Sequence, residues 1–252
     1  MRRMSLSLST LALLALVASP AIAADTKPAA QAKIVVDDPA KVTDPDFAMQ
    51  GEYAGEIKHE NESQKIGVQV IALGNHKFQA VGYRGGLPGT AAKVSVRDKS
   101  EGEAKDGVVL FQGKTGSGKL TGGVLSVLDA DGKELGQLKK VTRTSPTLGT
   151  KAPAGAVILF DGSNVDAFDK GRMTEDKLLM QGITTKQKFG SYTMHLEFRL
   201  PYQPSDRGQG RGNSGCYAQG RYEVQILDSF GLEGKDNECG GIYTIKSPDV
   251  NM

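Results

Sequence analysis

Apolar and polar residues alternate over residues 191–200, and this alternation constrains the fold more than any other feature. One face carries tyrosine, methionine, leucine and phenylalanine, and the other carries Thr193, His195, Glu197 and Arg199. A period of two is typical of an antiparallel strand with one buried face. We therefore predict a half-buried strand over residues 191–200.

Residues 221–228 repeat this alternation. Tyr222, Val224 and Ile226 are predicted to face a core, whereas the polar residues between them are predicted to face outward. Same-face residues on a strand lie about 6.6 Å apart, so Glu223 and Gln225 could contact neighbouring hydroxyls of one sugar. They follow Gly212-Asn-Ser-Gly215, whose glycines leave room for a ligand, and they precede Asp228.

An earlier part of the chain also has short strand-like runs. Residues 66–73 and 77–83 flank Gly74-Asn75-His76, which is a hairpin signal, and residues 107–112, 123–128 and 135–142 continue the series. Short, evenly spaced strands are typical of a small β-sandwich or barrel. The 32 glycines and few long apolar runs agree with an all-β protein.

The N-terminus predicts export. Arg2 and Arg3 precede an apolar stretch, and Ala21-Ile22-Ala23 is a small-x-small cleavage site, so residues 1–23 are predicted to be a signal peptide. The apolar stretch is short for a membrane span. We therefore expect a protein of the periplasm or the medium, without a membrane span after signal removal.

Composition divides the rest into four segments. We predict a flexible linker at 24–46, an accessory β domain at 47–143, a Pro/Gly/Thr linker at 144–155 and a second β domain at 156–252. The formal charge of +2 is equal to the contribution of Arg2 and Arg3. The remaining chain is formally neutral, which gives no field that would attract nucleic acid.

Two cysteines, Cys216 and Cys239, stand 23 positions apart. In an exported chain they can form a disulfide if their strands are neighbours, and the alternative is a pair of buried free thiols. Their spacing does not fit a structural zinc site.

Ordered motifs in residues 156–252 resemble the 3-keto-disaccharide hydrolase domain family. They are Leu159-Phe-Asp-Gly-Ser163, Lys188-Phe-Gly-Ser-Tyr192, Leu196-Glu-Phe-Arg199, Asn213-Ser-Gly215, Arg221-Tyr-Glu-Val-Gln-Ile-Leu-Asp228 and Gly240-Gly-Ile-Tyr243. The resemblance implies a concanavalin A-like jelly-roll sandwich with a concave face for sugar. Residues 47–143 similarly resemble the β domain that precedes this module in some planctomycete proteins.

The chain departs from the family pattern in two places. Ala167-Phe168 stands where the family usually has a tryptophan, and the family continues with further strands beyond the segment matched by residues 242–251. We therefore expect an incomplete sandwich, truncated at its C-terminus, with an exposed hydrophobic sheet edge.

A 3-keto sugar can be cleaved without the carboxylate pair of ordinary glycosidases. Its ketone acidifies the hydrogen at C2, so a base can remove that hydrogen and the enolate can expel the C1 substituent before water adds back. Glu223 is the first candidate base and His195 the second, with Asp228 as a further catalytic candidate. Arg199, or a divalent metal held by Glu223, Asp228 and His195, would stabilise the oxyanion.

The remaining polar residues are candidates for substrate binding, and they are Arg199, Asn213, Arg221, Gln225 and Glu197. Two other hypotheses compete with a hydrolase acting on 3-keto-glycosides. One is a non-catalytic carbohydrate-binding module, which the absence of tryptophan disfavours. The other is a scaffold whose polar faces are simply solvated and hold cross-strand ion pairs.

Overall fold

A computed structural model describes residues 33–59, 62–90, 94–114 and 116–251. The predicted signal peptide therefore lies outside the described residues. The helical elements are η1 (Pro39–Lys41), α1 (Pro45–Met49) and η2 (Gly208–Gly210). The strands are β1 (Gly51–His59), β2 (Glu62–Gly74), β3 (Lys77–Arg84), β4 (Ser95–Lys105), β5 (Val108–Gln112), β6 (Ser117–Thr121), β7 (Val124–Leu128), β8 (Glu134–Val141), β9 (Phe168–Asp169), β10 (Thr184–Thr185), β11 (Asn213–Ala218) and β12 (Tyr222–Leu227). The predicted all-β class is confirmed.

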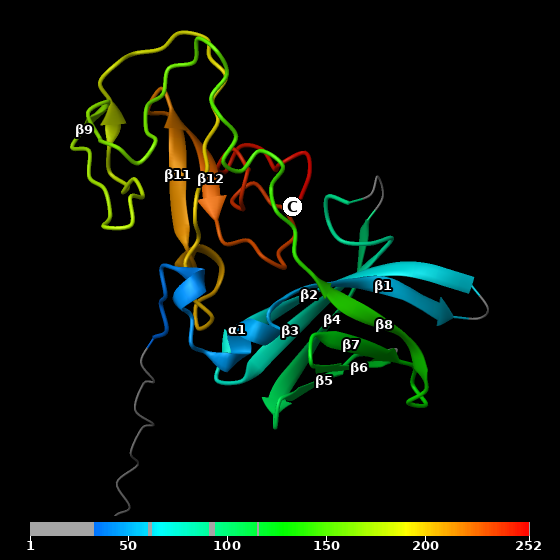
Figure 1. Ribbon diagram of the computed structural model, residues 1–252. Coiled ribbons are helices and arrows are strands. Elements are labelled where there is room, and N and C mark those ends of the chain that lie inside the picture. Colours follow the sequence, from blue (N-terminus) through cyan, green and yellow to red (C-terminus); the bar gives the residue numbers. More distant parts are fainter. Residues whose placement is uncertain (1–32, 60–61, 91–93, 115, 252) are drawn as a thin grey trace, which may run out of the picture. The chain divides into compact units, whose positions relative to one another are not determined.

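Strands β1 to β8 form a closed antiparallel barrel in chain order (Figure 1). The barrel closes because β1 pairs with β8 as well as with β2. Gly55 and Gly136 lie at this seam, where a Cβ atom would stand 2.6 Å and 2.5 Å from backbone oxygens of the neighbouring strand. Of the two predicted alternatives, sandwich and barrel, the structure has the barrel.

The predicted hairpin at Gly74-Asn75-His76 is confirmed as the turn between β2 and β3. Asn75 and His76 have φ angles of 56° and 61°, which is the left-handed conformation that two-residue hairpin turns require. This turn also holds helix α1, since the Asp46 carboxylate accepts hydrogen bonds from the His76 backbone N–H and contacts His76 Nδ1, both at 2.9 Å.

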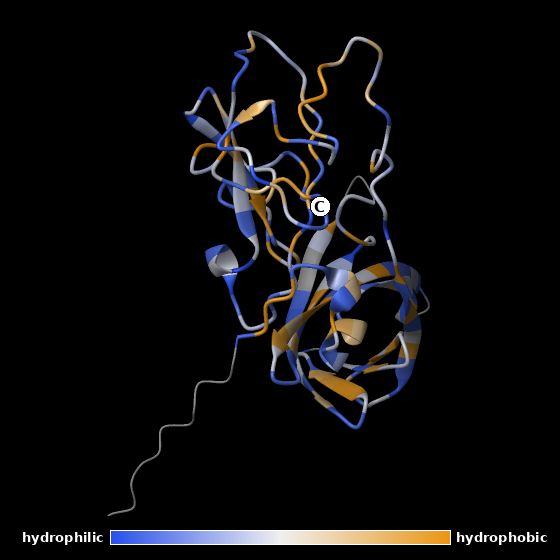
Figure 2. Cartoon of the chain, turned by 60° about the vertical axis from the view of Figure 1, so that its left-hand side comes forward, coloured by the Kyte–Doolittle hydropathy of each residue, from blue (hydrophilic) through white to orange (hydrophobic). Residues whose placement is uncertain are grey.

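Apolar side chains from alternate positions fill the interior of the barrel. Tyr53, Phe78 and Phe111 are the largest of them and are almost completely buried. Figure 2 shows how hydrophobic and hydrophilic residues mix along the strands around this interior. Inward-facing positions of the barrel strands are therefore apolar, as expected for strands with one buried face.

Strand β2 is buried on both faces, unlike an ordinary barrel strand. Its outward-facing Ile71 packs with Val81 and Tyr83 of β3, and we call these three residues the outer patch. Phe230, far along the chain, packs against the outer patch. A long apolar run in a strand is expected where both faces are covered, so the apolar sequence of β2 has a structural cause.

A polar network borders the outer patch. Tyr83 Oη donates to Gln69 Oε1 at 2.8 Å, and Gln69 Nε2 donates to Glu52 Oε1 at 3.0 Å. Arg143, just past β8, completes the network through an ion pair with Glu52. Burial raises the pKa of Tyr83 to about 12, which keeps the phenol protonated as a donor.

Residues 33–46 differ from the flexible linker predicted over residues 24–46. Val36 exchanges backbone hydrogen bonds with Tyr202 at 3.0 and 2.8 Å. Asp44 caps α1 through the Asp46 N–H and also accepts a hydrogen bond from Tyr202 Oη at 3.0 Å. The short, polar sequence of this segment thus serves as turns and caps rather than as a free tether.

The described part of residues 156–251 forms two two-stranded sheets, β9–β10 and β11–β12. The predicted strand over residues 191–200 is wrong, because residues 192–200 have no regular structure. Tyr192, Met194, Leu196 and Phe198, predicted to be buried, are each about half exposed. Alternation becomes a strand only when a neighbour accepts the backbone hydrogen bonds, and the described residues provide none here.

We predict that Phe111→Ala lowers the free energy of unfolding by about 3–5 kcal/mol, because it empties a buried ring position. Leu110→Ala is the matched control, since Leu110 is the adjacent residue and is half exposed; its effect should stay within about 0.5 kcal/mol. Chemical denaturation followed by circular dichroism measures both values. Equal losses in the two variants would contradict the described barrel interior.

We also predict a pH-dependent contribution from His76. The Asp46 carboxylate, through its hydrogen bond and its charge, raises the pKa of His76 above its ordinary value of about 6.5. The stabilisation is therefore fully present below that ordinary value and is lost as the pH rises through the raised pKa. The difference in unfolding free energy between the parent and His76→Gln should shrink from pH 5 to pH 9. A difference that does not change with pH would contradict this.

Candidate functional site

Strands β11 and β12 form the hairpin that carries most of the predicted site residues. Tyr217 lies directly opposite Glu223, and Gly215 lies opposite Gln225. Gln219 and Gly220 have φ angles of 54° and 64° and form the connecting turn. The prediction of a strand up to residue 228 is confirmed over Tyr222–Leu227, whereas Arg221 belongs to the turn and donates its N–H to the Ala218 carbonyl.

Glu223 is half-buried and holds a specific partner. Tyr217 Oη donates a hydrogen bond of 2.7 Å to Glu223 Oε2. A Cβ atom at Gly215 would stand 1.9 Å from Glu223 Oε1. The space that the glycine leaves is therefore filled by the Glu223 side chain, not by the ligand that the sequence predicted there.

The hydrogen bond to Glu223 and the charge of its carboxylate raise the pKa of Tyr217. The phenol thus remains protonated through the neutral range, next to a carboxylate. A carboxylate and a phenol in direct contact can take up a proton at one oxygen and release another proton at the other.

The burial of β12 is the reverse of the prediction. Side chains do alternate as predicted, but Gln225 is 2% exposed, whereas Tyr222 and Val224, predicted to face a core, are 45% and 43% exposed. Gln209 and the Asn237 carbonyl lie over the side chain of Gln225, whereas residues 240–243 hydrogen-bond to the backbone of β12 at its edge. Gln225 therefore faces protein rather than a sugar, and its Nε2 donates to Gln209 Oε1 at 2.9 Å.

His195 and Glu197 do contact each other. His195 Nε2 lies 3.0 Å from Glu197 Oε1, and the Gly149 N–H donates to the same oxygen at 2.6 Å. The imidazole first, and this backbone donor second, lower the pKa of Glu197. The pair lies in an exposed segment and fits the alternative hypothesis of a solvated surface ion pair.

The other predicted residues have separate partners. Arg199 forms an ion pair of 2.6 Å with Asp176, and Asp228 forms one of 3.1 Å with the buried Arg211. Asn213 Nδ2 donates to the Gln209 backbone and side-chain oxygens at 3.1 Å. The Arg221 guanidinium lies 5.6 Å from the Tyr222 ring.

The structure does not assemble the predicted metal set. Among the described residues, no three His, Cys, Asp or Glu side chains lie together in a way that could hold a metal ion. Nor does a hydrogen bond or ion pair in this part of the chain join Glu223 to His195, Asp228 or Arg199. These residues depend on different neighbours because residues 192–200 do not pair with β11 or β12.

Cys216 and Cys239 are free thiols in this structure, so the disulfide, one of the two alternatives, is not formed. Burial raises the pKa of Cys216. This favours the neutral thiol. The other alternative was a pair of buried free thiols, and both thiols are half-buried rather than buried.

Tyr217, Gln209 and Arg211 were missed by the sequence analysis. Tyr217 has a partial signal, because Gln219-Gly220 indicates a turn before β12. Tyr217 lies opposite Glu223 only with the three-residue turn 219–221 that the structure has, since a two-residue turn would place it opposite Tyr222. Gln209 and Arg211 lie in and just after the 3-10 turn η2, and their contacts with Gln225 and Asp228 have no periodic signal.

Comparison with known families supports the resemblance. Residues 155–252 match the model of the 3-keto-alpha-glucoside-1,2-lyase-like domain. The recognition based on the ordered motifs is thereby confirmed for this region, and the match supports a carbohydrate-related function. No curated protein and no solved structure matches the chain. Within the described residues, no helix is both long and apolar enough to cross a membrane.

We predict that Glu223→Gln lowers the pKa of Tyr217 toward its ordinary value of about 10, because the variant removes the negative charge that the phenol contacts. Gly215→Ala should act in the same direction by displacing the Glu223 side chain. Alkaline titration of tyrosine by ultraviolet difference spectroscopy or NMR measures the shift. Glu197→Gln is the matched control and should leave the Tyr217 titration unchanged. If Glu223→Gln also leaves it unchanged, the described pair is wrong.

Proposed function

We propose that residues 155–252 act on 3-keto-glycosides. Glu223 removes the C2 hydrogen as a base, and the C1–oxygen bond is cleaved by elimination followed by hydration. The match to the 3-keto-alpha-glucoside-1,2-lyase-like domain supports the substrate class. The contact between Tyr217 and Glu223 is the single structural observation that carries the assignment of residues.

The first step is removal of the C2 hydrogen. The Glu223 carboxylate takes this hydrogen as a proton, and the electrons of the C–H bond form the enolate of the C3 ketone. Glu223 suits this role because it is half-buried, held by one hydrogen bond, and carries no ion pair in the described part of the chain.

The second step is expulsion of the C1 substituent. The enolate electrons re-form the C3 carbonyl and create a C1–C2 double bond as the C1–oxygen bond breaks. Tyr217 gives its phenolic proton to the departing oxygen and receives the proton held by Glu223 through their 2.7 Å contact. The carboxylate and the phenol are then in their starting states.

Water completes the hydrolysis. Its hydroxyl adds to C1 and a proton adds to C2, so the sum of the steps is a 3-keto sugar and a free alcohol. Export to the periplasm or the medium belongs to the same proposal and is supported by the signal-peptide pattern of residues 1–23.

One observation favours a second candidate, a carbohydrate-binding module without catalysis. Tyr217 and Tyr222 are 58% and 45% exposed, on the two faces of the β11–β12 hairpin. Exposed aromatic rings can stack on the apolar face of a pyranose.

We predict that Glu223→Gln reduces kcat for a 3-keto-disaccharide by about 10²–10⁴-fold and Tyr217→Phe by about 10²-fold, because each removes one proton-transfer group. Glu56→Gln is the control, since Glu56 is an exposed barrel carboxylate that accepts a hydrogen bond from the Ser63 hydroxyl. Reducing-sugar release measures turnover, and calorimetry with the same sugar measures binding. Undiminished turnover in Glu223→Gln would remove Glu223 from catalysis, and binding without turnover in the parent chain would favour the binding module.

A further inference from the structure

We propose that the barrel positions the candidate catalytic strand β12, and that it does so through residues 229–241, which we call the docking loop. The effect of this positioning on catalysis rests on the proposed function. The positioning of β12 itself is argued from contacts alone. It assigns a role to the barrel, which lies outside the region matched by the family.

The first link is the contact between the docking loop and the outer patch. Phe230 packs against Ile71, Val81 and Tyr83. Gly231 has a φ angle of 79°, and a Cβ atom there would stand 2.5 Å from Ile71 Cδ1 and 2.8 Å from Ile71 Cγ1. Ile71 is 4% exposed and has little room to yield, so the loop backbone rests directly on the barrel at this glycine.

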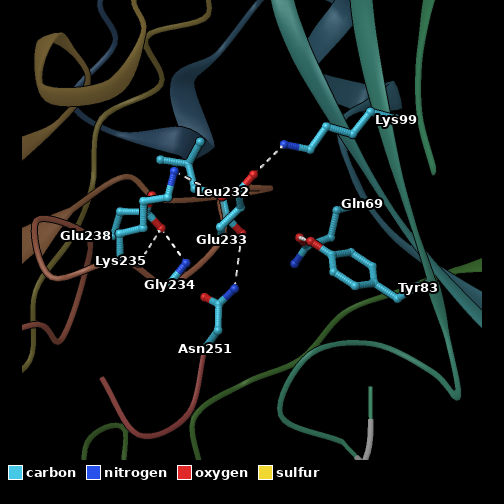
Figure 3. A network of polar contacts seen from close by, with 9 residues as sticks. All are labelled: Gln69, Tyr83, Lys99, Leu232, Glu233, Gly234, Lys235, Glu238 and Asn251. Atoms are coloured by element: carbon cyan, nitrogen blue, oxygen red, sulfur yellow. Dashed lines mark hydrogen bonds and ion pairs between the residues drawn. The ribbon is translucent and has the colours of Figure 1, made fainter. Parts of the chain in front are cut away.

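An ion pair adds a second attachment beside the outer patch. Lys99 Nζ of β4 lies 3.1 Å from Glu233 Oε1, and Glu233 Oε2 also holds Lys235 at 3.0 Å. Figure 3 shows Lys99 reaching Glu233, with Gln69 and Tyr83 of the barrel nearby. Both groups are substantially exposed, so this pair orients the loop more than it stabilises it.

Internal hydrogen bonds hold the docking loop rigid, so a shift at its contact with the barrel would also move β12. The Glu238 carboxylate, 7% exposed, accepts hydrogen bonds from the backbone N–H groups of Gly234 and Lys235 (Figure 3). The Cys239 N–H donates to Ser229 Oγ at 2.8 Å, which ties the two ends of the loop. Hydrogen bonds to a buried carboxylate are among the stronger ones in proteins.

The last link joins the docking loop to β12. The Gly240 N–H donates to the Gln225 carbonyl and the Gln225 N–H donates to the Gly241 carbonyl, both at 2.9 Å. The Tyr243 N–H then donates to the carbonyl of Glu223 itself, again at 2.9 Å. The backbone of the candidate base is thus held by a segment whose other end rests on the barrel.

Residues Ile71 and Gly231 are therefore positioning residues, because they act on β12 through the docking loop. We expect Gly231→Ala to lift the loop from the outer patch and loosen the backbone at residues 223–225. Gly132→Ala is a close control, because Gly132 has a φ angle of 81° but no atom within 4 Å of its Cβ position. Both substitutions strain a left-handed residue, and only the first meets the barrel.

The test is amide hydrogen exchange on the full chain, resolved at Gln225, Gly240 and Tyr243. Gly231→Ala should speed exchange at these amides by tenfold or more relative to the parent, while the β5–β7 amides stay unchanged and Gly132→Ala leaves all three as they were. Adding Ile71→Val to Gly231→Ala removes the Cδ1 atom nearest the clash and should restore part of the protection. Unchanged exchange in Gly231→Ala, or an equal increase in Gly132→Ala, would overturn the proposal.

Two further measurements separate this inference from the proposed function. The Tyr217 titration should shift toward its ordinary value in Gly231→Ala, because the Glu223 contact weakens with the strand; a Tyr217 pKa equal to that of the parent would count against positioning. If the parent chain turns over a 3-keto-disaccharide, kcat should fall in Gly231→Ala more than in Gly132→Ala. Equal kcat values in the two variants would overturn the claim that this positioning supports catalysis. If the parent chain shows no turnover, the proposed function fails while the exchange data still decide the positioning.

Discussion

Closure of the barrel by the pairing of β1 with β8 is the constraint on which the rest of this structure depends. An open eight-stranded sheet would leave the backbone groups of both end strands unpaired. Closure satisfies them and fixes which face of each strand points inward. Because the interior is then full, the outward side chains of β2 and β3 are free to support another part of the chain, and the docking loop uses that surface.

The barrel was predictable in kind from local signals. The strand-like runs of β2 and β3 and the turn residues Gly74-Asn75-His76 between them are visible in the sequence. The choice between a sandwich and a barrel was not predictable, since it depends on a pairing between residues 52 and 141. Nothing in a period-two pattern encodes a partner 89 positions away.

The candidate site shows where sequence reasoning fails, and for a physical reason. Alternation correctly divided β12 into two faces, but it could not say which face is covered, because that depends on the loop that folds over it. Gln209 and the Asn237 carbonyl contact the Gln225 side chain, so Gln225 is buried while Val224 is exposed. Over residues 192–200 the same pattern gave no strand at all, since pairing needs a neighbour. Tyr217 emerged only when the hairpin register was known.

Glu52 and Val141 are direct partners across the barrel seam, which means that the chain enters and leaves this domain at neighbouring strands. Adjacent strands lie about 4.8 Å apart. A domain with its two ends side by side can be inserted into a host loop, or removed from one, at little entropic cost. Such a module is suited to recombination during evolution, whereas the docking loop would have to be acquired together with the surface it rests on.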